Sequence, residues 1–474
     1  MKLVRNLPNG PILKFSTSAQ VGKIEKEIYT FFDNNEKLSS LILDLSEITY
    51  IQTPTTLVFL IQFIYKRSID NLETYLILPI SDQIKTILFT WRFFEILEEL
   101  TGKELNSFIC NNQDSVATAK YTIGDTTFHI DITQDYFDKF YKEEQIKALV
   151  KKGFFSLVSE PFKEAKQKSL ALKKQWGKWS TEKLITDVIQ YILLEKTVIG
   201  NLLSNTIIFE CLTNAANHPN SDHFVIGSFF DFNLDTAKTT EKEGFVDTNS
   251  SKKNKKKKAN LNYFTIVMWD DGESIINTLL ASLKDGINIR ANKYFELAKK
   301  TGYRSWFRII RDNYTAKAST ENFIYYDYLP SLTTPPDLIL LSSFLPGISR
   351  LPLNGADPNN ENKGTAGLKK KNLENVSEVS SGSGMGLSYL LKAVVNDLNG
   401  SIHIRTSEFL LEMNRARRSV DKKYNDLEFF NTVNKSINKE VDYYCKSELK
   451  FYPSKNKYHF LGNMITIKIP VINN

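Results

Sequence analysis

The stretch from Asn205 to Pro219, NTIIFECLTNAANHP, places a carboxylate beside a carboxamide. Its apolar residues recur at helical spacing, so we interpret the stretch as one helix. Glu210 and Asn214 are then one turn apart, and their side chains meet. An amide oxygen can ligate Mg2+ and a carboxylate can orient or deprotonate a water, as a magnesium-nucleotide site requires. Taken alone, the stretch fits an amphipathic surface helix equally well.

Two later stretches carry further chemistry. Residues Phe264–Ile275, FTIVMWDDGESI, form an apolar strand pattern that runs into Asp-Asp-Gly, although an ordinary turn is the alternative there. Residues Ser380–Leu391, SSGSGMGLSYLL, form a glycine-rich turn that opens into a helix. Backbone N–H groups and the helix dipole at such a turn can hold phosphate oxygens. A dinucleotide-binding turn follows a strand directly, whereas a long polar loop precedes these glycines.

The three stretches in this order, E-x-x-x-N-A-x-x-H, D-x-G-x-S and G-x-G-x-G-L, resemble the GHKL ATPases. That superfamily includes gyrase B subunits, MutL, sensor histidine kinases and anti-sigma-factor kinases. The resemblance covers roughly residues 181–470. It implies ATP and Mg2+ as cofactors, and an α/β sandwich in which a mixed sheet packs on helices.

The resemblance also implies a role for each matching residue. Asp270 would accept a hydrogen bond from the adenine amino group, and Gly272 would let the backbone approach the base closely. Asn214 would ligate Mg2+, and Glu210 would position or activate the attacking water or hydroxyl. The glycine turn would hold the nucleotide through Gly382, Gly384, Met385, Gly386 and Leu387.

Some features extend the family pattern or depart from it. Ser274 stands where the family usually has a second glycine. Residues 346–375 are rich in Asn, Gly, Pro and Lys, which predicts a mobile loop. In the family this region forms the lid over the phosphates. In this chain the lysines of the presumed lid that could neutralise the γ-phosphate are Lys363, Lys369, Lys370 and Lys371. We expect His218 to cap its helix rather than contact phosphate.

The secondary-structure pattern of the same region predicts strands over 224–232, 263–269, 401–406 and 463–471, and helices over 181–198, 281–300, 306–311 and 385–398. In the family the last two strands usually form a short hairpin. Here about fifty residues intervene, with a helical pattern between Glu408 and Tyr444. We interpret that insertion as a partner or dimer surface.

Residues 1–110 predict a small α/β domain. Strands are expected over 11–15, 41–45 and 74–78, and helices over 19–32 and 54–66, with a third helix capped by Ser81. Alternating strands and helices imply a layered sheet. The segment LILDLSEITYIQTPTTLVFLI resembles the core of STAS domains, in which an Asp-Ser pair opens the helix and the serine can be phosphorylated. Gln52 and Thr53 hold those positions here, and we expect Thr53 to act as a helix cap.

Residues 111–180 are interpreted as a connector. A hairpin is expected over 117–132, turning at Gly124-Asp125, with helices over 134–152 and 161–176. A sensor histidine kinase would present a phospho-accepting histidine on a helix here, followed by an acidic residue and a proline. His129 is the only histidine before the ATPase region, and it lies in a strand pattern, which argues against histidine autophosphorylation.

The amino-acid composition favours a globular protein of the cytoplasm. The chain of 474 residues is 42% hydrophobic and 24% charged, without an apolar run long enough to span a bilayer and without a signal-peptide core. Three widely spaced cysteines suit a reducing cytoplasm. The net charge of +7 is concentrated in Lys252–Lys258, KKNKKKK, which we interpret as a solvated loop, with nucleic-acid or acidic-membrane binding as the alternative.

The sequence therefore predicts a cytoplasmic α/β multidomain protein. A STAS-like α/β layer is expected over 1–110, a connector over 111–180, and a GHKL domain over 181–474 with insertions near 237–260, 281–380 and 408–460. The expected function is Mg-dependent ATP hydrolysis coupled to lid closure and to a change of protein-partner or homodimer contacts. The alternatives are a protein serine/threonine kinase resembling anti-sigma-factor kinases, and a nucleotide-gated scaffold without turnover.

Overall fold

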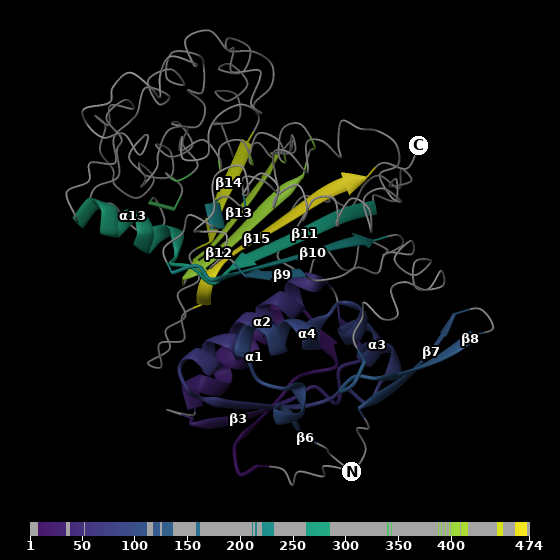
Figure 1. The fold of residues 1–474 in the computed structure, drawn as a ribbon. Coiled ribbons are helices and arrows are strands. Elements are labelled where there is room, and N and C mark those ends of the chain that lie inside the picture. The colour runs from purple at the N-terminus through teal and green to yellow at the C-terminus, as the bar shows by residue number, and fades with distance from the viewer. Residues whose placement is uncertain are drawn as a thin grey trace, which may run out of the picture.

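The computed structural model shows a mixed α/β architecture with one four-stranded and one seven-stranded sheet (Figure 1). The coarse fold class predicted from the sequence is therefore confirmed. The residues that the structure describes are 8–34, 38–51, 53–110, 117–123, 126–135, 158–161, 211, 214–215, 220–231, 262–284, 339–340, 343, 387, 390, 394, 398, 400–407, 409–415, 443–448 and 460–471.

The first sheet is parallel throughout, in the order β1-β3-β5-β6. Parallel strands need crossover connections, which helices provide here. The strands are β1 (Ile12–Lys14), β3 (Ser40–Asp44), β5 (Glu73–Ile77) and β6 (Ile109–Cys110), and the helices are α1 (Val21–Asn34), α2 (Pro54–Ile69), α3 (Asp82–Thr90) and α4 (Phe93–Thr101), with a 3-10 turn η1 (Leu105–Ser107). The strands and helices predicted for this region are confirmed, with their ends moved by a few residues. A short parallel pair, β2 (Ser18–Ala19) with β4 (Tyr50–Ile51), was not predicted.

Two helix starts show how local chemistry sets the boundaries. Ser81 caps α3 as predicted, since its hydroxyl accepts a hydrogen bond from the backbone N–H of Ile84 at 3.4 Å. Thr53 occupies the N-cap position of α2, with Pro54 in the first turn. The predicted cap position is therefore confirmed, although the Thr53 side chain accepts no capping hydrogen bond. The Thr53 carbonyl accepts the Thr56 N–H at 3.1 Å instead.

The predicted hairpin is present as β7 (Thr118–Ile123) and β8 (Thr126–Asp131), paired antiparallel around the expected turn. Most of the two connector helices lies outside the described residues. A strand that the sequence pattern did not indicate, β9 (Val158–Pro161), falls in the connector and pairs with β10 of the larger sheet.

The larger sheet has the order β14-β13-β12-β15-β11-β10-β9. Every pairing between its described strands is antiparallel, whereas a mixed sheet was predicted. The four predicted strands are confirmed as β10 (His223–Asp231), β11 (Asn262–Asp270), β12 (Ser401–Ser407) and β15 (Phe460–Val471). β12 and β15 are antiparallel neighbours although they are far apart in the chain.

The helical pattern predicted between Glu408 and Tyr444 is wrong where the structure describes it. β13 (Phe409–Arg415) extends the sheet beside β12, and β14 (Tyr443–Glu448) pairs with β13. The consecutive residues Phe409, Leu410 and Leu411 are all buried. A strand in which neighbouring side chains on both faces are covered accommodates such a run, and sheet pairing overrides local preference.

Two helical regions accompany this sheet. α13 (Ile275–Lys284) begins six residues before the predicted start at Ala281, and the rest of that predicted helix lies outside the described residues. Leu387 and Leu390 are helical as predicted, whereas Leu398 lies in a bend, so this helix ends earlier than expected. After this helix, the Gly400 N–H donates to the Val394 carbonyl at 2.7 Å.

Helix α2 lies between the two sheets (Figure 1), and one hydrophobic core includes residues of α1, α2 and both sheets. Because α2 is covered on both sides, nearly all its side chains are buried, from Pro54 to Arg67. Its sequence consequently lacks the polar face of a surface helix. Among the described residues, no helix is long and apolar enough to cross a membrane.

Candidate functional site

Three polar residues form a row across the centre of the seven-stranded sheet. Asp270 ends β11, Asn463 lies on β15 and Thr406 lies on β12. The register pairs Asp270 with Asn463 and Asn463 with Thr406, so their side chains project from the same face. All three are buried, with at most 5% of any residue exposed. We call this set the Asp270 row.

Asn463 is the central member of the Asp270 row. Its amide nitrogen donates to Asp270 Oδ1 at 3.1 Å and to the Glu273 carbonyl at 3.0 Å. Its amide oxygen accepts the Thr406 hydroxyl at 2.6 Å and the Ile275 N–H at 3.0 Å. These four bonds agree on one orientation of the amide. Asn463 therefore ties the end of β11 to the beginning of α13.

The Asp270 carboxylate also shapes the turn that follows β11. Its Oδ1 accepts the backbone N–H of Gly272 at 3.1 Å, which closes an Asx turn. Gly272 and Asn463, which donate to Oδ1, are neutral groups. A carboxylate has about four lone-pair positions, so Asp270 can accept hydrogen bonds beyond these two.

Ser274 starts α13 directly after this turn. Its hydroxyl accepts the Asn277 N–H at 3.1 Å, and its carbonyl accepts the Thr278 N–H at 2.9 Å. This is N-cap geometry, for which serine is among the preferred residues. Ser274 thus has a structural role, and its cap explains why α13 starts earlier than predicted.

Gly462 lets β15 approach the end of β11 more closely than any other residue would. Its φ is +77°, and a Cβ built there would lie 1.7 Å from the Asp270 carbonyl oxygen. The pairing of β12 with β15 shifts register next to this point, between Thr406 and Ser407. A glycine within a strand pattern is the usual signal of a bulge or a close backbone approach. Sequence reasoning missed Gly462, although that signal was present.

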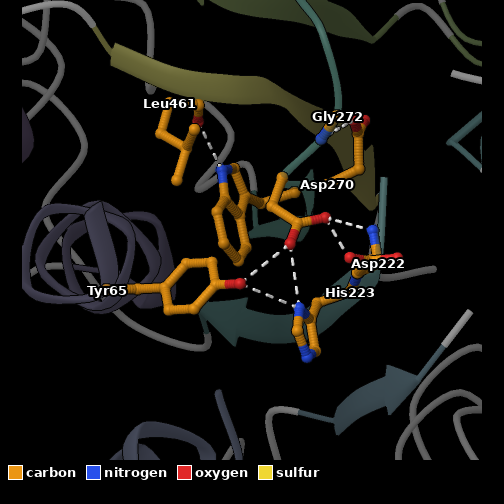
Figure 2. A network of polar contacts seen from close by, with 8 residues as sticks. Tyr65, Asp222, His223, Asp270, Gly272 and Leu461 are labelled. Atoms are coloured by element: carbon orange, nitrogen blue, oxygen red, sulfur yellow. Dashed lines mark hydrogen bonds and ion pairs between the residues drawn. The ribbon is translucent and has the colours of Figure 1, made fainter. Parts of the chain in front are cut away.

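A second cluster, shown in Figure 2, anchors the start of β10 to the turn after β11 and to α2. Asp271 Oδ1 accepts the N–H groups of Asp222 at 2.7 Å and His223 at 2.8 Å. Asp271 Oδ2 lies 2.8 Å from His223 Nδ1 and accepts the Tyr65 hydroxyl at 3.2 Å. Tyr65 also packs edge-on against Trp269, so the side chains of Trp269 and Asp271 both face α2.

Tyr65 stays a donor within this cluster. Its burial raises the pKa of the phenol above its ordinary value, and the nearby Asp271 carboxylate raises it further. The neutral hydroxyl therefore donates to Asp271 at physiological pH. Asp271, which sequence reasoning treated as part of a turn, thus links α2 to the larger sheet.

The other predicted site residues are placed only in part. Asn214 is helical and half-buried, and its neighbours Cys211 and Ala215 are buried, in agreement with the predicted amphipathic helix. Leu387 is helical and packs against the core. The residues outside the described part of the chain are Glu210, His218, Gly382, Gly384, Met385, Gly386, the predicted lid with its lysines, the lysine run 252–258 and the helices over 181–198 and 306–311.

Sequence reasoning found Asp270 and Gly272, which the structure brings together, but missed Asn463, Thr406 and Gly462. No local motif marks Asn463 or Thr406, because their importance comes from cross-strand pairing. Within the described residues, no group of three or more His, Cys, Asp or Glu side chains is arranged to hold a metal ion. In comparisons with known proteins, no family model, no curated protein and no solved structure matches this chain.

Proposed function

We propose that this protein binds ATP with Mg2+ in a GHKL-type site and hydrolyses it. The observation that carries the proposal is the Asp270 row. It places a buried carboxylate at the end of a central strand, beside the Asx turn at Gly272. An adenine amino group needs a buried acceptor, and a pre-oriented carboxylate supplies one at little reorganisation cost. Asn463 and Gly272 hold that carboxylate in one orientation.

The arrangement of the larger sheet supports the same proposal. The resemblance requires the two closing strands to pair, and β12 and β15 do so across the intervening insertion. It also requires helices at the first and third motifs. The described residues there, among them Asn214 and Leu387, are helical, and Ala215 and Leu390 belong to one hydrophobic core with β11.

In this proposal the remaining roles follow the motifs. Asn214 ligates Mg2+, Glu210 positions the attacking water, and the glycine turn from Gly382 to Gly386 binds the phosphates. The parallel sheet of the first 110 residues would be a STAS-like unit. ATP hydrolysis would close the lid and change the contacts with a protein partner or with a second copy of the chain.

A protein serine/threonine kinase is the second candidate, and one observation favours it. Thr53 stands at the N-terminus of α2, where the STAS resemblance places the phosphorylated serine, and its hydroxyl is not used in capping. A phosphate at a helix N-terminus is electrostatically favourable. A nucleotide-gated scaffold without turnover remains the third candidate.

The variant Asp270→Asn tests nucleotide binding. The asparagine oxygen can keep the bonds from Gly272 and Asn463, so the fold should persist, while the amide nitrogen replaces an acceptor with a donor. We expect ADP affinity to fall by about 2–4 kcal/mol, the scale of a buried hydrogen bond to a charged group. Isothermal calorimetry measures this directly.

The matched control is Asp44→Asn. Asp44 also ends a strand, and its Oδ1 also accepts the N–H two residues ahead, from Ser46 at 2.9 Å, but it lies in the first sheet. ADP should bind this control as it binds the wild type. Unchanged ADP affinity in a folded Asp270→Asn protein would remove Asp270 from the site.

The variant Asn214→Ala tests the magnesium assignment. Loss of the amide oxygen should abolish the Mg2+ dependence of ATP binding, while adenosine, which lacks phosphates, should bind nearly as before. Titrations of ATP and adenosine with and without Mg2+ separate the two effects. If ATP binding by the variant still responds to Mg2+ as in the wild type, Asn214 is not the ligand.

A further inference from the structure

Helix α2 touches the back of the proposed nucleotide site at several points along its length. Phe59 stacks on Phe460 at the start of β15, with ring centroids 5.9 Å apart. Almost one turn later, Gln62 Oε1 accepts the N–H of Leu461 at 3.2 Å. Tyr65, a further three residues along the helix, donates to Asp271. Spacings of three residues place all three side chains on one side of the helix.

These contacts reach residues next to the members of the Asp270 row. Leu461 precedes Gly462 and Asn463, and its carbonyl accepts the Trp269 indole N–H at 2.8 Å. Asp271 follows Asp270 directly. The helix therefore holds the two strand ends whose separation fixes the bond between Asn463 and Asp270.

A buried ion pair makes a comparable contact with the third strand. Arg405 on β12 lies 2.5 Å from Glu25 of α1, and both side chains are almost fully buried. The guanidinium group also lies over the Phe59 ring, 5.5 Å from its centroid. The next residue on β12 is Thr406, the third member of the Asp270 row.

The sheet register explains why these contacts come in adjacent pairs. Met464 pairs with both Trp269 and Arg405, and this second row projects from the face opposite the Asp270 row. The second row faces α1 and α2, because Trp269 contacts Tyr65 and Arg405 contacts Glu25. A shift of α2 would therefore move the same three strands that position Asp270, Asn463 and Thr406.

We propose that docking of α2 onto the sheet holds the nucleotide site in its binding geometry, so that nucleotide affinity and the position of the N-terminal unit are coupled. The proposal rests on the proposed function, because its ligand is the nucleotide at Asp270. Tyr65 and Gln62 are positioning residues, acting through Asp271 and Leu461. Coupling of this kind is reciprocal, so bound nucleotide must in turn stabilise the docking of α2.

The experiment compares two near-isosteric variants with the wild type. Tyr65→Phe removes the hydroxyl that donates a hydrogen bond to Asp271, and Gln62→Met removes the oxygen that accepts the Leu461 N–H. Each should weaken ADP binding about five- to thirtyfold in calorimetry, within the usual range of coupling between sites. Tyr75→Phe is the matched control, since its hydroxyl bonds to exposed Glu73 on the first sheet, and it should bind ADP normally.

A second measurement separates coupling from general loosening. Saturating ADP should slow hydrogen exchange of the α2 amides in the wild type, and this protection should be lost in Tyr65→Phe. Suppose that the wild type binds ADP. The coupling is then refuted if both variants bind ADP as tightly as the wild type, and it is also refuted if ADP leaves hydrogen exchange of α2 unchanged. In either case the nucleotide site stands. If the wild type binds no ADP, the proposed function itself fails, and the coupling fails with it.

Discussion

The variant Glu210→Ala should bind ADP as tightly as the wild type, and yet its rate of ATP turnover should be lower by roughly a hundredfold or more. Binding should persist because the base and phosphate contacts are assigned to Asp270 and the glycine turn. Turnover should fall because a positioned general base contributes typically about 10² to 10⁴ in rate. Calorimetry with ADP and release of labelled phosphate from γ-labelled ATP measure the two quantities on one preparation.

A suitable control is Glu47→Ala, which removes an exposed carboxylate that is ion-paired with Lys14. Surface pairs of this kind contribute little, so binding and turnover should both be unchanged. Turnover at the wild-type rate in Glu210→Ala would show that another group positions the attacking oxygen. That result would leave the binding assignments intact.

The fate of the label separates the three candidate functions. Free phosphate supports the ATPase. Label on a serine or threonine, in this chain or in a partner, supports the kinase, and Thr53 is the first position to inspect because its hydroxyl makes no cap bond. Tight ATP binding with neither product supports the scaffold.

The variant Gly462→Ala should destabilise the fold by about 4 kcal/mol and abolish ADP binding. A left-handed backbone costs a residue with a side chain about 1–2 kcal/mol. The Cβ would in addition meet the Asp270 carbonyl at 1.7 Å, which forces backbone apart in a closely packed sheet. Because that displacement moves Asp270 itself, the nucleotide site should be lost even in molecules that stay folded.

Two other glycines resolve the components of this effect. Gly102 also has a positive φ, +64°, but no atom lies within 4 Å of its built Cβ, so Gly102→Ala should cost only about 1 kcal/mol. Gly22 lies in α1 with neither constraint, and Gly22→Ala should be neutral or stabilising. Urea denaturation of the three variants measures how much each substitution changes the free energy of unfolding. A Gly462→Ala cost no larger than that of Gly102→Ala would refute the close approach.

Local signals in the sequence determined much of the first sheet and the position of Asp270. Ser81 and Pro54 marked helix starts that depend only on neighbouring backbone groups. The apolar run ending in Asp-Asp-Gly placed Asp270 at the end of a buried strand, and the structure agrees. Such signals act over a few residues, which is why they can be detected in a single chain.

The outer strands of the larger sheet depend on tertiary pairing more than on local sequence. The sequence of β13 resembled a helix, but pairing with β12 and burial of consecutive apolar residues made it a strand. β9 was not indicated at all, and its conformation is supported by pairing with β10. A short segment adopts the structure that the edge of an existing sheet imposes on it.

Only the tertiary structure identified the partners of Asp270. Asn463 lies 193 residues beyond it, and the two meet because β11 and β15 pair in one register. A shift of a single residue would turn Asn463 to the opposite face of the sheet, toward α2. Register between distant strands depends on the whole sheet, including the close approach at Gly462 and the docking of α2, and none of these is encoded within one motif.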